Sequence, residues 1–199
     1  MTLSNLRLLL TACAAATAFG TAVPALADGP SGEMLASTCA GCHGTDGASL
    51  GPAAPTIAAL STDYFVLSMK DFQTGKRPST VMGRIAKGYT DDQIKAMAVF
   101  FQSKPFVRTG QPVDAAKAKE GKALAKKFCE SCHEDEGRIG EGVGVLAGQW
   151  LPYMEFSVAD FRAGTREMEK RQAKKFEELA EAHGDAGFSA ILHYYASVK

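Results

Sequence analysis

The sequence has no excess of charge of either sign, because 22 lysine and arginine residues are balanced by 22 aspartate and glutamate residues. Surfaces that bind nucleic acid are normally basic, so we do not expect nucleic acid as a partner. The chain also lacks low-complexity tracts and has no Gly-x-Gly-x-x-Gly nucleotide-binding motif. Apolar residues make up 46% of its 199 residues, which is typical of a soluble protein with one large or two small domains.

Long apolar runs are missing from most of the chain, and the exception is the alanine-rich stretch over residues 8–23. Ala25-Leu26-Ala27 follows it as a small-residue cleavage site, so residues 1–27 are predicted to be a cleaved secretory signal peptide. Pro24 interrupts an already short run, which argues against a membrane span. The segment ending at Cys13 also resembles a lipobox, but that interpretation leaves the apolar residues after the cysteine without a purpose. We therefore expect a periplasmic protein.

Cysteine is scarce, and the four cysteines of the mature chain form two Cys-x-x-Cys-His motifs, at residues 39–43 and 129–133. Two thiols one helical turn apart can each add to a vinyl group of one porphyrin, and the next histidine then lies under the iron. Zinc ribbons, redox dithiols and structural disulfides are the competing interpretations. Zinc ribbons place such pairs about 15–20 residues apart, and redox dithiols occur in a βαβ context that this sequence lacks.

The motifs therefore predict two covalently bound haem c groups, one in each half of the chain. The predicted attachment residues are Cys39, Cys42, Cys129 and Cys132, and the predicted iron ligands within the motifs are His43 and His133.

The two motifs lie in two copies of one repeat. Residues 32–36 correspond to residues 121–125, and residues 71–77 recur as residues 160–166, which is 89 positions later. Each copy is too small to bury a generous core, so a large buried cofactor would help to stabilise it.

Apolar spacing of three to four residues predicts helices, and no strand pattern occurs. The predicted helices cover residues 63–74 and 91–102 in the first copy and 153–163 and 185–196 in the second, with one more helix before each motif. The fold class is therefore all-α. The expected organisation is a first domain over residues 28–104, a linker over 105–114 that contains two prolines and a glycine, and a second domain over 115–199.

The sixth iron ligand distinguishes an electron carrier from an enzyme, because a methionine sulfur closes the site whereas an open position admits substrate. Met82 lies between predicted helices, where its side chain can point at a haem face, and it is the predicted ligand in the first half. The offset of 89 pairs Met82 with Arg171, which cannot bind iron. Met168, three residues earlier, is therefore the preferred ligand in the second half, and His183 or an open site is the alternative.

The ring nitrogen of a ligating histidine that does not bind the metal usually donates a hydrogen bond to a carbonyl. Pro55 is the preferred carbonyl for the first haem, within the rigid loop of residues 51–57. The corresponding loop of the second half, residues 142–146, contains no proline, so the environments of the two haems are expected to differ. Trp150, the only tryptophan, is expected to pack either against the second haem or in the core.

Several segments between the motifs resemble known families. The repeated Asp-Phe-x-x-Gly segments and the run Gly148-Gln149-Trp150-Leu151-Pro152-Tyr153 are similar to those of two-haem shuttle cytochromes, which have two tandem class I cytochrome c domains. Residues 81–89, 146–150, 168–170 and 193–197 resemble the dihaem cytochrome c subunit of flavocytochrome c sulfide dehydrogenase in more detail.

The second resemblance implies a periplasmic heterodimer with an FAD-containing flavoprotein subunit. Sulfide would be oxidised on that partner, and electrons would pass through the two haems to a small soluble cytochrome c. The alternatives are a free shuttle serving a terminal oxidase and a catalyst such as a dihaem peroxidase or a thiosulfate dehydrogenase. A peroxidase would need distal acid–base groups, and a cysteine-ligated haem would need a cysteine outside the motifs. The mature sequence shows neither, so we expect no independent catalytic site.

Overall fold

A computed structural model describes residues 29–108 and 110–199, so the predicted signal peptide and Cys13 lie outside the described residues. The described residues form helices and no strands, which confirms the all-α prediction. The helices of the first half are α2 (Gly32–Ser37), α3 (Ala40–His43), η1 (Thr45–Gly47), α4 (Thr62–Thr74), α5 (Met82–Ile85), η2 (Ala86–Gly88) and α6 (Asp91–Gln102). Those of the second half are α7 (Ala115–Phe128), α8 (Glu134–Gly137), α9 (Leu151–Arg162) and α10 (Lys170–Ser197).

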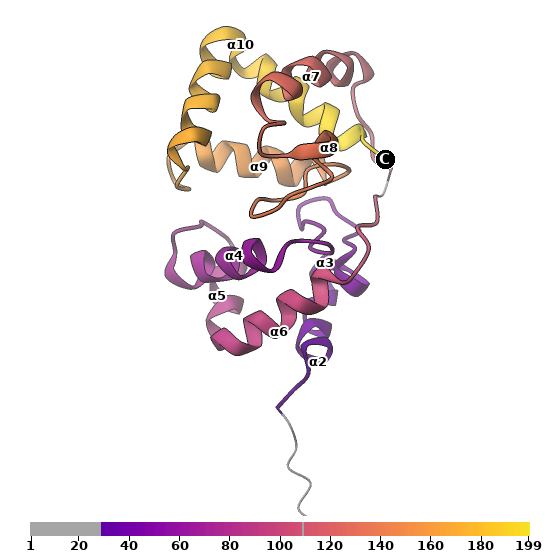
Figure 1. Cartoon of the computed structure of the whole chain (residues 1–199), viewed down its shortest axis with the longest axis vertical. Helices are drawn as coiled ribbons and strands as arrows, with labels where there is room; N and C mark the ends of the chain where they lie inside the picture. Colours follow the sequence, from indigo (N-terminus) through magenta and orange to yellow (C-terminus); the bar gives the residue numbers. More distant parts are fainter. Residues whose placement is uncertain (1–28, 109) are drawn as a thin grey trace, which may run out of the picture.

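The two halves stack end to end, with α2 to α6 below and α7 to α10 above in Figure 1. Each half has its own buried core. Ile94, Met97 and Phe101 of α6 are central to the first, and residues of α7 and of the last part of α10 contribute most of the second. Val145 is the exception, because it follows α8 in the second half but is buried in the core of the first. The two halves are therefore joined by side-chain packing as well as by the covalent linker.

Helix α6 illustrates how local sequence sets an element. The Thr90 side chain accepts a hydrogen bond from the Gln93 N–H, and the Gln93 side chain accepts one from the Thr90 N–H, which forms a capping box. Buried Ile94, Met97, Ala98 and Phe101 then share one face at helical spacing. The predicted helix over residues 91–102 is confirmed to the residue.

Helix α10 is longer than expected, and Gly184 divides it. Its backbone adopts φ 55° and ψ −152°, which are not helical angles and which glycine tolerates because it has no Cβ atom. The part after Gly184 corresponds to the predicted helix over residues 185–196. The part before it, residues 170–183, brings Phe176 and Leu179 onto the second core. This additional helical segment has no counterpart of similar length in the first half.

Each half contains one close helix crossing at a glycine of the repeat. A Cβ atom on Gly32 of α2 would lie 2.4 Å from the Ala96 carbonyl oxygen of α6. A Cβ atom on Gly121 of α7 would lie 1.9 Å from the Ala190 carbonyl oxygen of α10. The helices can approach this closely only because both positions lack a side chain.

We expect Gly121→Ala to destabilise the protein by about 1–3 kcal/mol, the usual range for overpacking a core. Intrinsic helix propensity alone would favour alanine by about 1 kcal/mol. Packing dominates because the clashing atom is a backbone carbonyl oxygen, which cannot rotate away. Denaturant unfolding of the haem-loaded protein measures the change. Gly88→Ala is the control, since a Cβ atom there meets nothing within 4 Å, and an equal loss in both variants would contradict the packing argument.

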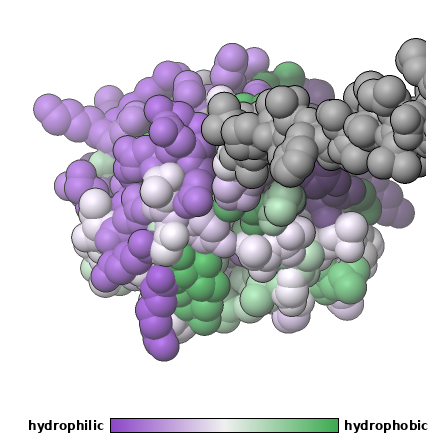
Figure 2. Space-filling model, turned by 90° about the horizontal axis from the view of Figure 1, so that it is seen from below, coloured by the Kyte–Doolittle hydropathy of each residue, from purple (hydrophilic) through white to green (hydrophobic). Residues whose placement is uncertain are grey.

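The end of the molecule formed by the first half carries apolar patches among hydrophilic side chains (Figure 2). Met34 of α2 and Val99 of α6 are large apolar residues that stay exposed in this half. No helix among the described residues combines the length and the apolar character that crossing a membrane requires.

Candidate haem-binding sites

The first Cys-x-x-Cys-His motif forms one turn of helix. The Cys42 and His43 N–H groups both donate to the Cys39 carbonyl oxygen, at 3.2 and 2.9 Å. This turn brings two thiols and an imidazole together from adjacent positions, and both cysteines are free. His43 is buried, and its Nδ1 lies 2.8 Å from the Pro55 carbonyl oxygen. In the structure the predicted carbonyl of Pro55 is thus within hydrogen-bond distance of the predicted ligand His43.

The second motif repeats this geometry at the end of α7. The Cys132 and His133 N–H groups donate to the Cys129 carbonyl oxygen at 3.1 and 3.0 Å, and both cysteines are again free. His133 Nδ1 lies 3.0 Å from the Gly144 carbonyl oxygen. A carbonyl in the loop without a proline therefore plays the same geometric role as Pro55.

Both histidines are held in the form that binds a metal ion. Burial lowers the pKa of His43, and it lowers the pKa of His133 to about 4, so both imidazoles are neutral at pH 7. A carbonyl oxygen can only accept a hydrogen bond, so Nδ1 carries the proton in each ring. The Nε2 lone pair of each ring is then available to iron.

The six methionines after Met1 fall into two groups. Three are core residues with at most 5% exposure, and Met34 is 65% exposed, so none of these four is placed to bind iron; the three core residues are Met69, Met97 and Met154. Met82 and Met168 are the two half-buried methionines. Met82 is the first residue of α5 rather than a loop residue, and it packs against the first core.

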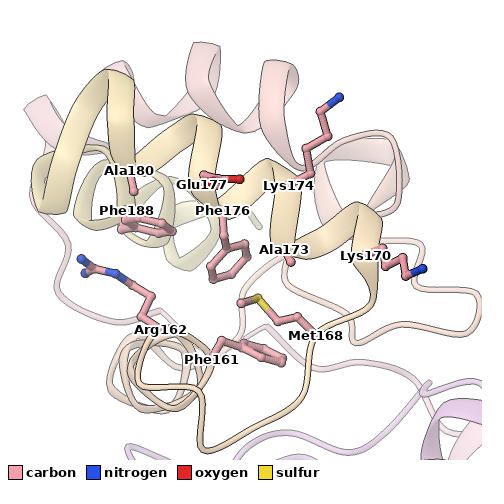
Figure 3. Close-up of a pocket in the computed structure, with 10 residues that line it drawn as sticks. All are labelled: Phe161, Arg162, Met168, Lys170, Ala173, Lys174, Phe176, Glu177, Ala180 and Phe188. Atoms are coloured by element: carbon pink, nitrogen blue, oxygen red, sulfur yellow. The ribbon is translucent and has the colours of Figure 1, made fainter.

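Met168 lies in the coil between α9 and α10. Figure 3 shows its side chain pointing into a groove between Phe161 of α9 and Phe176 of α10. The groove has a volume of about 750 Å³, and Phe188 also lines it. The lining does not include His133 or the cysteines of the motif. The structure thus gives Met168 an apolar, partly open pocket but does not bring it into contact with the second motif.

The remaining histidines have other contacts. His183 is exposed, and its ring packs edge-on against Phe128 at a centroid distance of 6.0 Å. His193 Nδ1 accepts a hydrogen bond from the Asp114 N–H at 3.0 Å, so it has a hydrogen-bonding role in the second half.

Trp150 and its neighbours bind the first half rather than the second haem motif. The Trp150 indole donates to the Ser49 carbonyl oxygen at 3.1 Å, and its ring lies so close to Gly51 that a Cβ atom there would be 2.3 Å away. The Gln149 side chain makes two hydrogen bonds to the Thr56 backbone. These interface roles were not predicted, because their partners are 93–101 residues away in the chain.

Two arginine–tyrosine pairs cross the interface between the halves. Arg77 donates to the Tyr153 hydroxyl at 2.8 Å. Although burial acts to raise the pKa of Tyr64, the positive charges of Arg77 and Arg166 beside it lower the pKa overall. Arg166 and Tyr153 lie 89 positions after Arg77 and Tyr64, so each half contributes the same two residues to a crossed arrangement.

Arg77 provides a test of whether these residues fit a haem. The residue is only 8% exposed and its guanidinium also donates to Ser68, yet within the described residues it forms no ion pair with a carboxylate. A buried cation without an anion is costly. A haem carries two propionates, so a bound haem would supply the missing negative charge, and Arg77, Tyr64 and Tyr153 would hold the propionate. The free thiols, the neutral imidazoles and this cation all fit haem c.

Two attachment turns in a duplicated all-α fold define a dihaem c-type cytochrome, which carries two covalently bound haem c groups and transfers electrons. No protein-family model matches the chain. Cytochrome c4 of Azotobacter vinelandii is 30% identical over 159 residues, which cover 71% of this chain and 76% of that protein. The chain therefore belongs to the cytochrome c4 family.

Two further comparisons refine this result. The cytochrome subunit of sulfide dehydrogenase from Chlorobaculum tepidum is 50% identical, but over 70 residues that cover 35% of this chain and 63% of the subunit. The chain thus spans less than two thirds of that relative. The structure of cytochrome c4 from Acidithiobacillus ferrooxidans matches with a TM-score of 0.69 at 25% identity, over 81% of this chain and 99% of that one. This likeness confirms the fold of two class I cytochrome c domains.

Proposed function

We propose that this cytochrome is the periplasmic subunit that accepts electrons from an FAD-containing sulfide dehydrogenase flavoprotein and passes them to a small soluble cytochrome c. The observation that carries the proposal is the 50% identity to the cytochrome subunit of sulfide dehydrogenase, against 30% to cytochrome c4. A second candidate, a free two-haem shuttle to a terminal oxidase, is favoured by the greater length of the cytochrome c4 match.

The proposal assigns residues 28–104 and 115–199 as the two haem domains and residues 105–114 as their linker. His43 and Met82 are the proposed iron ligands of the first haem, and His133 and Met168 those of the second. When bound, each haem supplies a one-electron Fe(III)/Fe(II) couple.

The residues of the chain hold and shield these couples. The cysteines would anchor each porphyrin edge, and the carbonyls of Pro55 and Gly144 fix the histidine rings by accepting hydrogen bonds from Nδ1–H. A thioether ligand from Met82 or Met168 would close the remaining iron position and raise the potential. The proposed chemistry is therefore electron transfer alone.

Sulfide should reduce both haems rapidly only in the presence of the flavoprotein partner. Mixing the oxidised cytochrome with the flavoprotein and sulfide in an anaerobic stopped-flow instrument measures the rate, and size-exclusion chromatography tests for a stable heterodimer. The control is sulfide with the cytochrome alone. A monomer that forms no complex, and that the flavoprotein reduces no faster than sulfide does, would favour the free shuttle.

A further inference from the structure

The loop that orients His43 is held from the other half of the molecule. Gln149, which is 2% exposed, lies just before α9, and its carboxamide faces Thr56 of the first half. The Thr56 N–H donates to Gln149 Oε1 at 3.0 Å, and Gln149 Nε2 donates to the Thr56 carbonyl oxygen at 2.9 Å. This side chain thus holds one residue of the loop at both of its backbone polar groups.

The Thr56 N–H belongs to the same peptide group as the carbonyl oxygen of Pro55. A peptide group is planar, so fixing its N–H from one side also fixes the direction of its C=O on the other. The Pro55 oxygen accepts a hydrogen bond from His43 Nδ1–H, and the two heavy atoms are 2.8 Å apart. A continuous chain of hydrogen bonds therefore runs from Gln149 through the peptide group to the imidazole, and each bond polarises the next.

The second half has no equivalent support. Its histidine carbonyl belongs to Gly144, so the matching N–H is that of Val145. Within residues 29–108 and 110–199, the Val145 N–H donates no hydrogen bond. The position 89 residues before Gln149 is Leu60, which has no carboxamide. Support through the peptide group is therefore a property of the first haem site alone.

We propose that Gln149 is a positioning residue for the first haem, through which the second half of the chain sets the orientation and basicity of His43. The inference rests on the proposed ligation of the first iron by His43. A strong hydrogen bond at Nδ1 makes the imidazole a more basic ligand, which favours Fe(III) and lowers the potential. Loss of the Gln149 contact weakens that hydrogen bond and raises the potential of the first haem.

Gln149→Leu keeps the approximate volume of the side chain and removes both hydrogen bonds to Thr56. We expect the midpoint potential of the first haem to rise while that of the second stays unchanged. A redox titration followed by NMR, which resolves the two haems, measures both potentials. In the same variant, hydrogen exchange at the Thr56 N–H should be about tenfold faster, as expected for the loss of a buried hydrogen bond. If Gln149→Leu does not take up haem, Gln149→Asn replaces it in the same measurements. Asparagine keeps the carboxamide but is too short to make both contacts with Thr56.

Gln111→Leu is the matched control. Gln111 also binds the segment around Gln149, accepting from the Leu151 N–H and donating to the Gln149 carbonyl oxygen, each at 2.8 Å. It should lower stability without moving the potential of the first haem. An unchanged or lower first potential in Gln149→Leu, a joint shift of both haems, or an equal shift in Gln111→Leu would overturn the proposal. A wild-type spectrum without histidine–methionine ligation would instead refute the proposed ligands.

Discussion

Replacement of Met82 by alanine is expected to abolish the methionine-to-iron charge-transfer band of the first haem and to lower its potential. The protein contains two haems, so about half of the total band intensity should remain. Met82 is half-buried against the first core, whereas Met69 and Met97 are buried within that core. Alanine cannot replace the thioether sulfur, so the iron would take water or remain open. Absorption spectroscopy of the oxidised protein measures the loss.

Met97→Leu provides the control, because exchanging methionine for leucine in a core usually costs less than about 1.5 kcal/mol and should leave the band intact. Full band intensity in Met82→Ala would refute the assignment. Met168→Ala should remove the other half of the intensity. Retention of the band in that variant alone would exclude Met168 as the second ligand. If the wild-type protein shows only half of the charge-transfer band intensity expected for two haems, the second iron has no methionine ligand. The exposed His183 or an open site would then remain as the alternatives for its sixth position.

The elements that could be predicted from the sequence are those set by neighbouring residues. Helix α6 has its cap at Thr90 and its buried face at Ile94 and Phe101, all within twelve residues, so local pattern decides it. The attachment motifs are local for the same reason. The helical segment over residues 170–183 was missed although its sequence is rich in lysine, glutamate and alanine, which favour helices. Alignment of the two halves obscured it, because the first half has no equal segment.

The interface between the halves could not be predicted, because nothing near Gln149 or Trp150 indicates their partners. Thr56 and Ser49 lie 93 and 101 residues earlier. The resemblance to two-haem shuttle cytochromes identified the run from Gly148 to Tyr153 but did not indicate what this run does physically. In the structure three residues of this run contact the first half, which makes it the main polar connection across the interface; they are Gln149, Trp150 and Tyr153.

Arg77→Met is expected to lower the stability of the haem-loaded protein by about 3–5 kcal/mol, the usual cost of removing one partner from a buried ion pair. The sign of this effect is informative. Within the described residues Arg77 has no carboxylate partner, and its guanidinium donates to the hydroxyls of Ser68 and Tyr153. If no anion faced it, replacing a buried cation by an apolar side chain of similar volume would be neutral or stabilising.

A haem propionate reverses this outcome, because methionine would leave the carboxylate buried without a cation. Denaturant unfolding of the holoprotein measures the change in free energy, and Arg84→Met is the matched control. Arg84 is exposed and, in the part of the chain that the structure describes, donates only to the Thr80 carbonyl oxygen, so its loss should change stability by less than about 0.5 kcal/mol. A neutral or stabilising Arg77→Met variant would show that no propionate lies at this interface. A large loss in Arg77→Met alone would place the negative charge of a haem between the crossed tyrosines, where both halves of the chain contribute to holding it.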